Sequence, residues 1–525
     1  MEFHIIYDRM VLYKFDFINH KGEKIMSRQE LFCEKNGKLH VWHTILTGFA
    51  FLSTSIAWAI YDPYITKILN RLLSESSWIT ALSNSLNEAF PVLAKFAETQ
   101  GQDVNAAGGG ITLVPLFIGV IMTFDNIFGV IFQPAFGKLS DRCRSKLGKR
   151  RPFIVYGAPI SAALFAIIPW VALSNSLPAT MVCIILFVFS MSLWRAPAVA
   201  LMPALTPPEL RSEGNAIINL MGGVGSVIGM VAGTLVGAVY KLVTGIGAIT
   251  TENEQSTTFP YVFLVGGLVM IIGMLVVRAF VKEPSSKLEV AAAKNQALDE
   301  KAKYEAEKAA KKEEKKARKE QKLSKSERKS LVFMLGGLFF LFCGTNAITT
   351  FFALFASEVL GKTTSEATIM TTLFAVCSAA AAIPAGKMGK KLGRKKTILI
   401  GLVIFMAVFL MYVLTGSMAL IWVALIFGGF ANMLITVNTL PLVLDIGGTD
   451  KVGTFTGYYY TATFSAQIAS PIIYGIVRML TGTYLSLFVY SPIMFILSIL
   501  LILFVKHGEA VPEEIVKKIE EENND

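Results

Sequence analysis

Long apolar stretches separated by short polar segments dominate the chain. Each stretch is long enough for an α-helix that crosses about 30 Å of hydrocarbon at 1.5 Å per residue. Twelve such stretches cover 43–69, 111–136, 153–174, 178–206, 214–242, 259–281, 331–357, 365–388, 397–415, 417–446, 452–480 and 483–505. The pattern predicts an all-α integral membrane protein with twelve transmembrane helices in two six-helix, pseudo-symmetric halves.

The polar segments divide the chain into five parts. We expect an N-terminal cytoplasmic segment at 1–42, a six-helix half at 43–281, a lysine-rich cytoplasmic linker at 282–330, a second six-helix half at 331–506 and a charged tail at 507–525. Within the first half, 70–110 is expected to be an outer loop that contains an amphipathic helix. Met26, shortly before the first apolar stretch, is a candidate for the true start of translation.

Composition supports a membrane protein and excludes other classes. Apolar residues make up 53% of the chain, charged residues 17%, and the mean hydropathy is +0.55. The net charge of +11 does not indicate a nucleic-acid partner. Most basic residues lie in the segments between apolar stretches, where they interact with anionic lipid headgroups. The cysteines have no metal-ligand spacing, and no phosphate loop or catalytic triad is present, so we expect no enzyme, no cofactor and no bound metal.

A short basic segment between the second and third stretches indicates the orientation. Residues 137–152 hold the basic side chains Lys138, Arg142, Arg144, Lys146, Lys149, Arg150 and Arg151. Short loops rich in Lys and Arg stay in the cytoplasm. We therefore expect a multi-pass protein of the cell membrane with both termini cytoplasmic. The segment 386–396 has a similar basic pattern at the same place in the second half, which is typical of a duplicated transporter.

The basic segment also resembles a known family signature. Gly137, Ser140-Asp141-Arg142, Gly148 and Arg150-Arg151 match the loop motif of the major facilitator superfamily. The resemblance implies a transporter in which this cluster, with a neighbouring helix end, holds one conformation closed. The implied latch residues are Gly137, Asp141, Arg142, Gly148, Arg150 and Arg151. The copy at 386–396 lacks the aspartate.

A narrower resemblance concerns the flanks of this segment and the fourth and fifth stretches. Gln133-Pro134, Arg151-Pro-Phe-Ile154, Ala196–Leu205 and Arg211–Ala216 are similar to sucrose/proton symporters of the solute-carrier sugar family and their bacterial glycoside/cation symporter relatives. The resemblance implies proton-coupled symport of a sucrose-type or maltose-type disaccharide or a glucoside, by a monomer in a lipid bilayer. Val199 and Ala204 stand where the plant carriers have an arginine and an aspartate.

Ionisable residues inside apolar stretches cost about 2.5 to 3.5 kcal/mol each on insertion and therefore need a partner or a function. Asp125 shares a helical face with Gly129, Gln133 and Gly137, which favours close helix packing around a proton-binding carboxylate. Arg195 can bind sugar hydroxyls or pair with Asp125. For both residues a purely structural ion pair is the alternative.

Asp62 is a second candidate for proton coupling. Counting about 28 Å of helix from the start of the first stretch places it near the outer interface, where a solvated carboxylate without a special role is expected.

Polar and aromatic side chains in the apolar stretches are candidates for sugar binding, because saccharides are held by hydrogen bonds and an aromatic face. The candidates are Arg195, Trp58, Gln133, Asn215, Asn219, Asn346, Asn432, Asn438, Tyr458, Tyr459 and Gln467.

Three other functions remain open. A sodium-coupled glycoside symporter of the melibiose type places two acids one turn apart on the second helix, where this chain has Gly129 and Gln133. An exporter of drugs or metabolites has the same fold. A non-transporting membrane sensor is expected to carry a large soluble signalling module, for which this chain has only the lysine-rich linker and a short tail.

Overall fold

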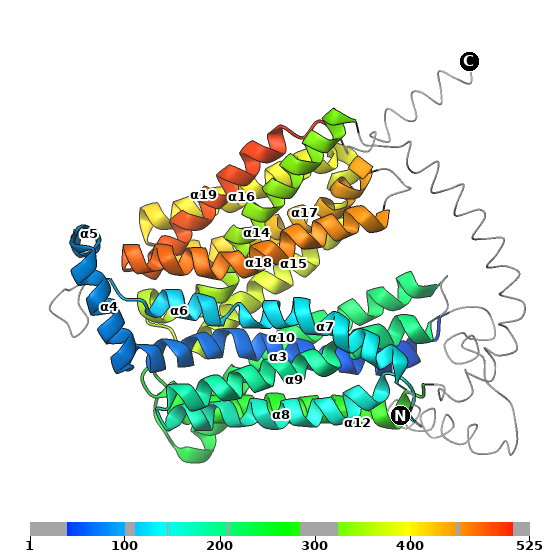
Figure 1. Ribbon diagram of the computed structural model, residues 1–525, viewed down its shortest axis with the longest axis horizontal. Coiled ribbons are helices and arrows are strands. Elements are labelled where there is room, and N and C mark those ends of the chain that lie inside the picture. The colour runs from blue at the N-terminus through cyan, green and yellow to red at the C-terminus, as the bar shows by residue number, and fades with distance from the viewer. Residues whose placement is uncertain are drawn as a thin grey trace, which may run out of the picture.

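The computed structural model describes residues 39–99, 111–143, 145, 147–206, 210–283, 324–447 and 452–507. These residues form long, nearly parallel helices (Figure 1). The described part of the chain contains no β-strand; an isolated backbone bridge joins Ser145 and Gly148. The all-α prediction is confirmed. The candidate start at Met26, most of the linker and most of the tail lie outside the described residues.

The helices of the N-terminal half match the first six apolar stretches closely. They are α3 (Val41–Ser74), α6 (Val114–Ile121), α7 (Phe124–Arg142), α8 (Arg151–Leu173), α9 (Leu177–Leu205), α10 (Arg211–Thr244) and α12 (Phe259–Phe280). Two short helices, α4 (Ser77–Ala89) and α5 (Pro91–Thr99), occupy the expected outer loop, and the one-turn α11 (Glu254–Thr257) precedes α12.

The C-terminal half holds six further long helices. They are α14 (Lys325–Leu360), α15 (Thr364–Leu392), α16 (Arg394–Thr415), α17 (Met418–Gly447), α18 (Val452–Thr481) and α19 (Leu487–Leu503), the last preceded by a 3₁₀ turn at Tyr484–Ser486. Capping boxes begin two of them: Ser324 pairs with Glu327 at α14, and Thr363 pairs with Glu366 at α15.

In the part of the chain that the structure describes, eleven spans are long and apolar enough to cross a membrane, with α6 and α7 counted together. The remaining long helix, α18, has 30 residues but includes the polar run Tyr458-Tyr-Tyr-Thr-Ala-Thr and Gln467. Its length still suffices for a span. The protein is therefore a multi-pass membrane protein, and its described residues form twelve long helical segments.

The second apolar stretch is interrupted, which its sequence did not predict. Helix α6 ends at Ile121 and α7 begins at Phe124, with Met122 and Thr123 between them. The break places Asp125 in the first turn of a new helix, where free backbone N–H groups favour a negative charge.

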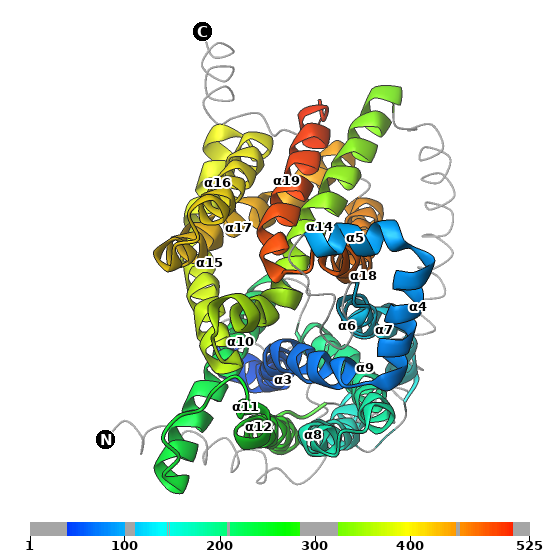
Figure 2. The same ribbon diagram turned by 90° about the vertical axis from the view of Figure 1, so that its left-hand side faces the viewer.

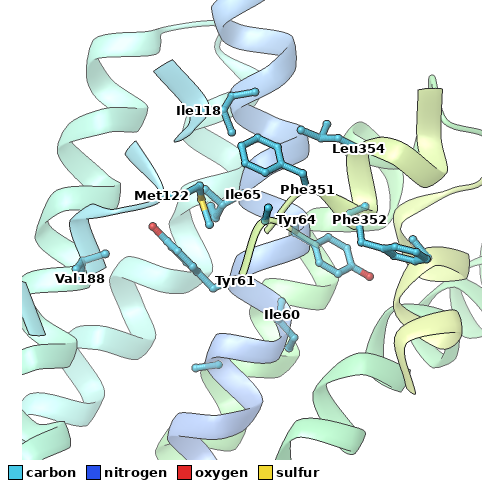
Figure 3. Packing of buried hydrophobic residues seen from close by; sticks show 14 of the residues in the cluster. Ile60, Tyr61, Tyr64, Ile65, Ile118, Met122, Val188, Phe351, Phe352 and Leu354 are labelled. Carbon is cyan, nitrogen blue, oxygen red and sulfur yellow. The ribbon is translucent and has the colours of Figure 1, made fainter. Parts of the chain in front are cut away.

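Helices α3, α6 and α10 of the N-terminal half meet α14, α15 and α18 of the C-terminal half at the boundary between the halves, with α10 packed against α15. Helix α3 packs against α14 and α6 against α18. Viewed end-on, the C-terminal helices lie on one side of this boundary and the N-terminal helices on the other (Figure 2). Tyr64 and Ile65 of α3, Ile118 of α6 and Phe351 of α14 belong to one buried cluster (Figure 3). One apolar core therefore continues through both halves.

Candidate functional site

Three charged side chains interact electrostatically inside the membrane-spanning part of the N-terminal half. They are Asp62 of α3, Asp125 of α7 and Arg195 of α9, and each is half-buried. Among the ion pairs of the described residues, none within 4 Å joins Arg195 to either carboxylate. With all three groups ionised the cluster carries one excess negative charge, which a proton can neutralise.

An aromatic ring adjoins this charged cluster. The Arg195 guanidinium carbon lies 5.4 Å from the centre of the Trp58 ring, within the range of a cation–π contact. Trp58 also packs edge-to-face on Tyr61, with ring centres 5.2 Å apart. Because Trp58 and Asp62 are four residues apart on α3, they share one helical face. The buried Trp58 Nε1–H has no hydrogen-bond partner among the described residues, so it is a donor that a ligand can satisfy.

Asp125 has a polar neighbour on its own helix. The Asn126 side-chain amide donates a hydrogen bond to Asp125 Oδ1 over 3.0 Å. This contact and the start of α7 orient the carboxylate without neutralising it. The group can therefore still take up a proton.

The expectation that Asp62 lies solvated at the outer interface is wrong. Helix α3 continues to Ser74, so about 18 Å of helix separates Asp62 from that end at 1.5 Å per residue. The count from His43 failed because α3, with 34 residues, is longer than a bilayer requires. Asp62 belongs to the charged cluster.

The predicted small-residue face of α7 does not pack closely against another helix. A Cβ on Gly137 would meet nothing within 4 Å, and one on Gly129 would meet only Gln133 of the same helix. Asp125 is therefore not enclosed by a small-residue helix contact on this face.

Asn438 does not have the free amide expected of a sugar-binding residue. It is 3% exposed, and its Nδ2 donates to the carbonyl oxygens of Leu434 and Ala385 at 2.8 and 3.3 Å. Its amide joins α17 to α15. Tyr459 is also buried, with its hydroxyl 3.4 Å from Thr439 Oγ1.

The other sugar-binding candidates are spread over several helices of the described part of the chain. Asn215 and Asn219 lie exposed on α10, and Tyr458 lies exposed on α18. Gln133 on α7, Asn432 on α17 and Gln467 on α18 are half-buried. Asn346 on α14 is half-buried too, and its buried Nδ2 has no partner among the described residues.

The basic turn forms a charge network within the N-terminal half. Arg150 pairs with Asp141 at 2.5 Å and with Glu283 at 3.7 Å. Glu283 also accepts the backbone N–H groups of Arg150 and Arg151 at 2.8 and 3.2 Å, and Arg151 donates to the Arg278 carbonyl at 2.7 Å. Sequence reasoning missed Glu283, which was assigned to the linker although it is the first acid after the sixth apolar stretch.

The second basic segment obtains its aspartate from another helix. Arg394, at the start of α16, pairs with Asp445 near the end of α17. The missing motif aspartate is thereby replaced in space, which a comparison of the two motifs alone could not show.

Hydrogen bonds between the two halves gather at the opposite end of the bundle, which we call the Glu254 end. The partners are Glu254 with Thr364, Lys67 with Ser357, Tyr64 with Ser365, Thr234 with Ser365 and Asn70 with Glu358. The described residues therefore form a conformation that is closed at the Glu254 end. Sequence analysis missed this group because Glu254 lies in a short polar segment just before the sixth apolar stretch.

Known proteins of similar sequence and structure are membrane transporters. Sucrose transport protein SUC3 of Arabidopsis thaliana is 32% identical over an alignment of 136 residues, and the match covers 22% of this chain and 23% of that protein. A D-xylose-proton symporter shares the fold with a TM-score of 0.56 at 13% identity, over 89% of this chain and 96% of the other. The nucleoside transporter NupG gives 0.55 at 13% identity, over 88% and 98%.

An inward-open structure of the xylose transporter XylE from E. coli gives a TM-score of 0.51 at 15% identity, over 89% of this chain and 94% of that one. At these identities the structures establish the fold alone. A family model provides broader evidence, because it matches residues 44–370 and 334–523. The chain therefore belongs to the Major Facilitator Superfamily, a family of transporters and not of enzymes.

Proposed function

We propose that this transporter moves a sugar together with a proton by alternating access. The observation that carries the proposal is the cluster of Asp62, Asp125 and Arg195 beside Trp58. A carboxylate pair with one cation can exchange a proton, and the guanidinium and indole can bind hydroxyl groups and the apolar face of a sugar ring. No cofactor is required beyond the coupling proton.

Asn346 on α14 supports a site between the halves. Counted at 1.5 Å per residue, Trp58 lies about 24 Å from the α3 end at Ser74, and Asn346 about 21 Å from the α14 end at Leu360. Both carry a buried N–H donor with no partner among the described residues. Donors at comparable depth on facing helices suit a solute bound near the midplane.

The sequence similarity favours a sugar as the solute. The matched part of the chain is 32% identical to a sucrose transport protein, and a structural neighbour is a D-xylose-proton symporter. We propose a disaccharide or glucoside as cargo.

We further propose that the basic turn faces the cytoplasm and the Glu254 end faces outward, in the cell membrane. Basic residues of short loops stay inside, and both basic segments lie at the same end. The two termini are then cytoplasmic, and the conformation closed at the Glu254 end is closed to the outside. We propose that the transporter works as a monomer.

Uptake by purified protein in liposomes tests this function. A panel of mono- and disaccharides, glucosides and nucleosides is offered with an acid-outside pH gradient, with a sodium gradient, or with neither. We expect at least one sugar to accumulate only under the pH gradient. Accumulation of nucleosides alone, or accumulation driven by sodium alone, would contradict the proposal.

A further inference from the structure

A carboxyl group is buried between the halves at the Glu254 end. Glu254 is 1% exposed and begins the one-turn helix α11. Its Oε2 accepts the backbone N–H of Thr364 at 2.7 Å, and its Oε1 lies 3.0 Å from Thr364 Oγ1. Thr364 is the first residue of α15. One side chain of the N-terminal half therefore caps a helix of the C-terminal half.

Charged side chains surround Glu254, but among the described residues none of them forms an ion pair with it within 4 Å. Lys67 of α3 and Glu366 of α15 interact with it electrostatically, with opposite signs. Lys67 donates to Ser357 of α14 and lies near Glu358, which is itself paired with Arg478 of α18 at 3.0 Å.

Nearby uncharged groups bind one another or the backbone. Gln255 donates to the Lys67 carbonyl at 3.2 Å, and the Tyr64 hydroxyl lies 3.3 Å from Ser365 Oγ. Burial, the largest cause, raises the pKa of Glu254 from 4.5 to about 7, against the lowering effect of the Thr364 hydrogen bonds and of Lys67.

We propose that Glu254 is a proton-operated gate between the halves. In its protonated form the carboxyl group holds α11 on the first turn of α15 and keeps the Glu254 end closed, and loss of the proton releases this end. The neutral carboxyl retains both contacts, because its carbonyl oxygen accepts the Thr364 N–H while its hydroxyl donates to Thr364 Oγ1.

The direction of the pH effect follows from linkage. When the halves separate, water reaches the carboxyl group and its pKa returns towards the ordinary value of 4.5. The closed form binds the proton more tightly than the open form, so closure becomes steadily more favourable as the pH falls below about 7, and this contribution is absent well above pH 7. This gate is independent of which solute is carried.

Distance measurements between spin labels at the Glu254 end test the gate. Labels are placed by Glu75→Cys and Ser417→Cys, two exposed positions on opposite halves, in the full chain with its native cysteines replaced. With wild-type Glu254, the closed-to-open ratio should rise about tenfold or more between pH 8.5 and pH 5.5, and the rise should begin as the pH falls below about 7.

Glu254→Gln mimics the protonated group and should remain closed at every pH. Glu252→Gln, an exposed acid two residues away, is the matched control and should titrate like the wild type. Thr364→Val lacks the hydroxyl and should close less at pH 5.5. The proposal is overturned if the wild-type ratio does not change with pH, if Glu254→Gln still titrates, or if Thr364→Val closes as fully as the wild type.

Discussion

At the residue scale, a buried charged residue can be recognised from the sequence only where it interrupts an apolar stretch. Asp125 and Arg195 could be predicted as functional candidates because each is costly in a spanning helix without a partner or a function. Their grouping with Asp62 could not, since it depends on where α3 lies relative to α7 and α9. Glu254 lies in a polar segment, and its burial arises only when α15 packs against it.

Replacement of Asp125 by asparagine separates proton coupling from solute binding. Asp125→Asn keeps the side-chain shape and the contact to Asn126 but removes the titrating group. We expect uphill accumulation of the sugar to be abolished, with a final inside-to-outside ratio near one, while counterflow exchange continues. Both are measured in liposomes, with Glu252→Gln as the control that accumulates normally. Retained accumulation by Asp125→Asn would assign the coupling proton to another group.

At the element scale, the apolar pattern located every long helix, because each must be apolar over about 20 residues to span the bilayer. The interruption between α6 and α7 and the one-turn α11 could not be predicted, since neither changes the hydropathy pattern. The network of the basic turn was predicted only in part, because Glu283 lies just beyond the end of α12 and far from the turn in sequence.

Two glycines of the same sequence motif should respond differently to alanine. Gly148 has a φ of +106°, and a Cβ there would lie 2.5 Å from the Glu283 carboxylate. Gly148→Ala should lower the free energy of unfolding by about 1–3 kcal/mol. Gly137→Ala, in a helix with open space around it, should be neutral or stabilise by up to about 1 kcal/mol. Thermal unfolding in detergent compares them, and equal effects would refute this structure of the turn.

At the scale of the whole molecule, the duplicated helix pattern predicted the two halves but not the state in which they meet. That state depends on contacts between α3, α6 and α10 on one side and α14, α15 and α18 on the other, which no local sequence pattern specifies.

A valine at the closest approach of the halves should open the Glu254 end. A Cβ on Gly119 of α6 would lie 2.1 Å from the Pro471 carbonyl oxygen of α18, so Gly119→Val cannot be accommodated in the closed conformation. The labelled pair at positions 75 and 417 should shift to longer distances. The control is Gly457→Val on α18, the helix that Gly119 contacts. A Cβ at Gly457 would meet nothing within 4 Å, so this variant should leave the distances unchanged. A closed Gly119→Val variant would contradict the helix contact.

Proton movement caused by sugar tests the central claim most directly. Liposomes that contain the purified protein and an internal pH dye receive a candidate sugar outside, with no ion gradient imposed. The account predicts that sugar entry acidifies the interior, and that Asp125→Asn abolishes the acidification while labelled sugar still equilibrates. Sugar entry at the wild-type rate with no change in internal pH would contradict proton-coupled transport.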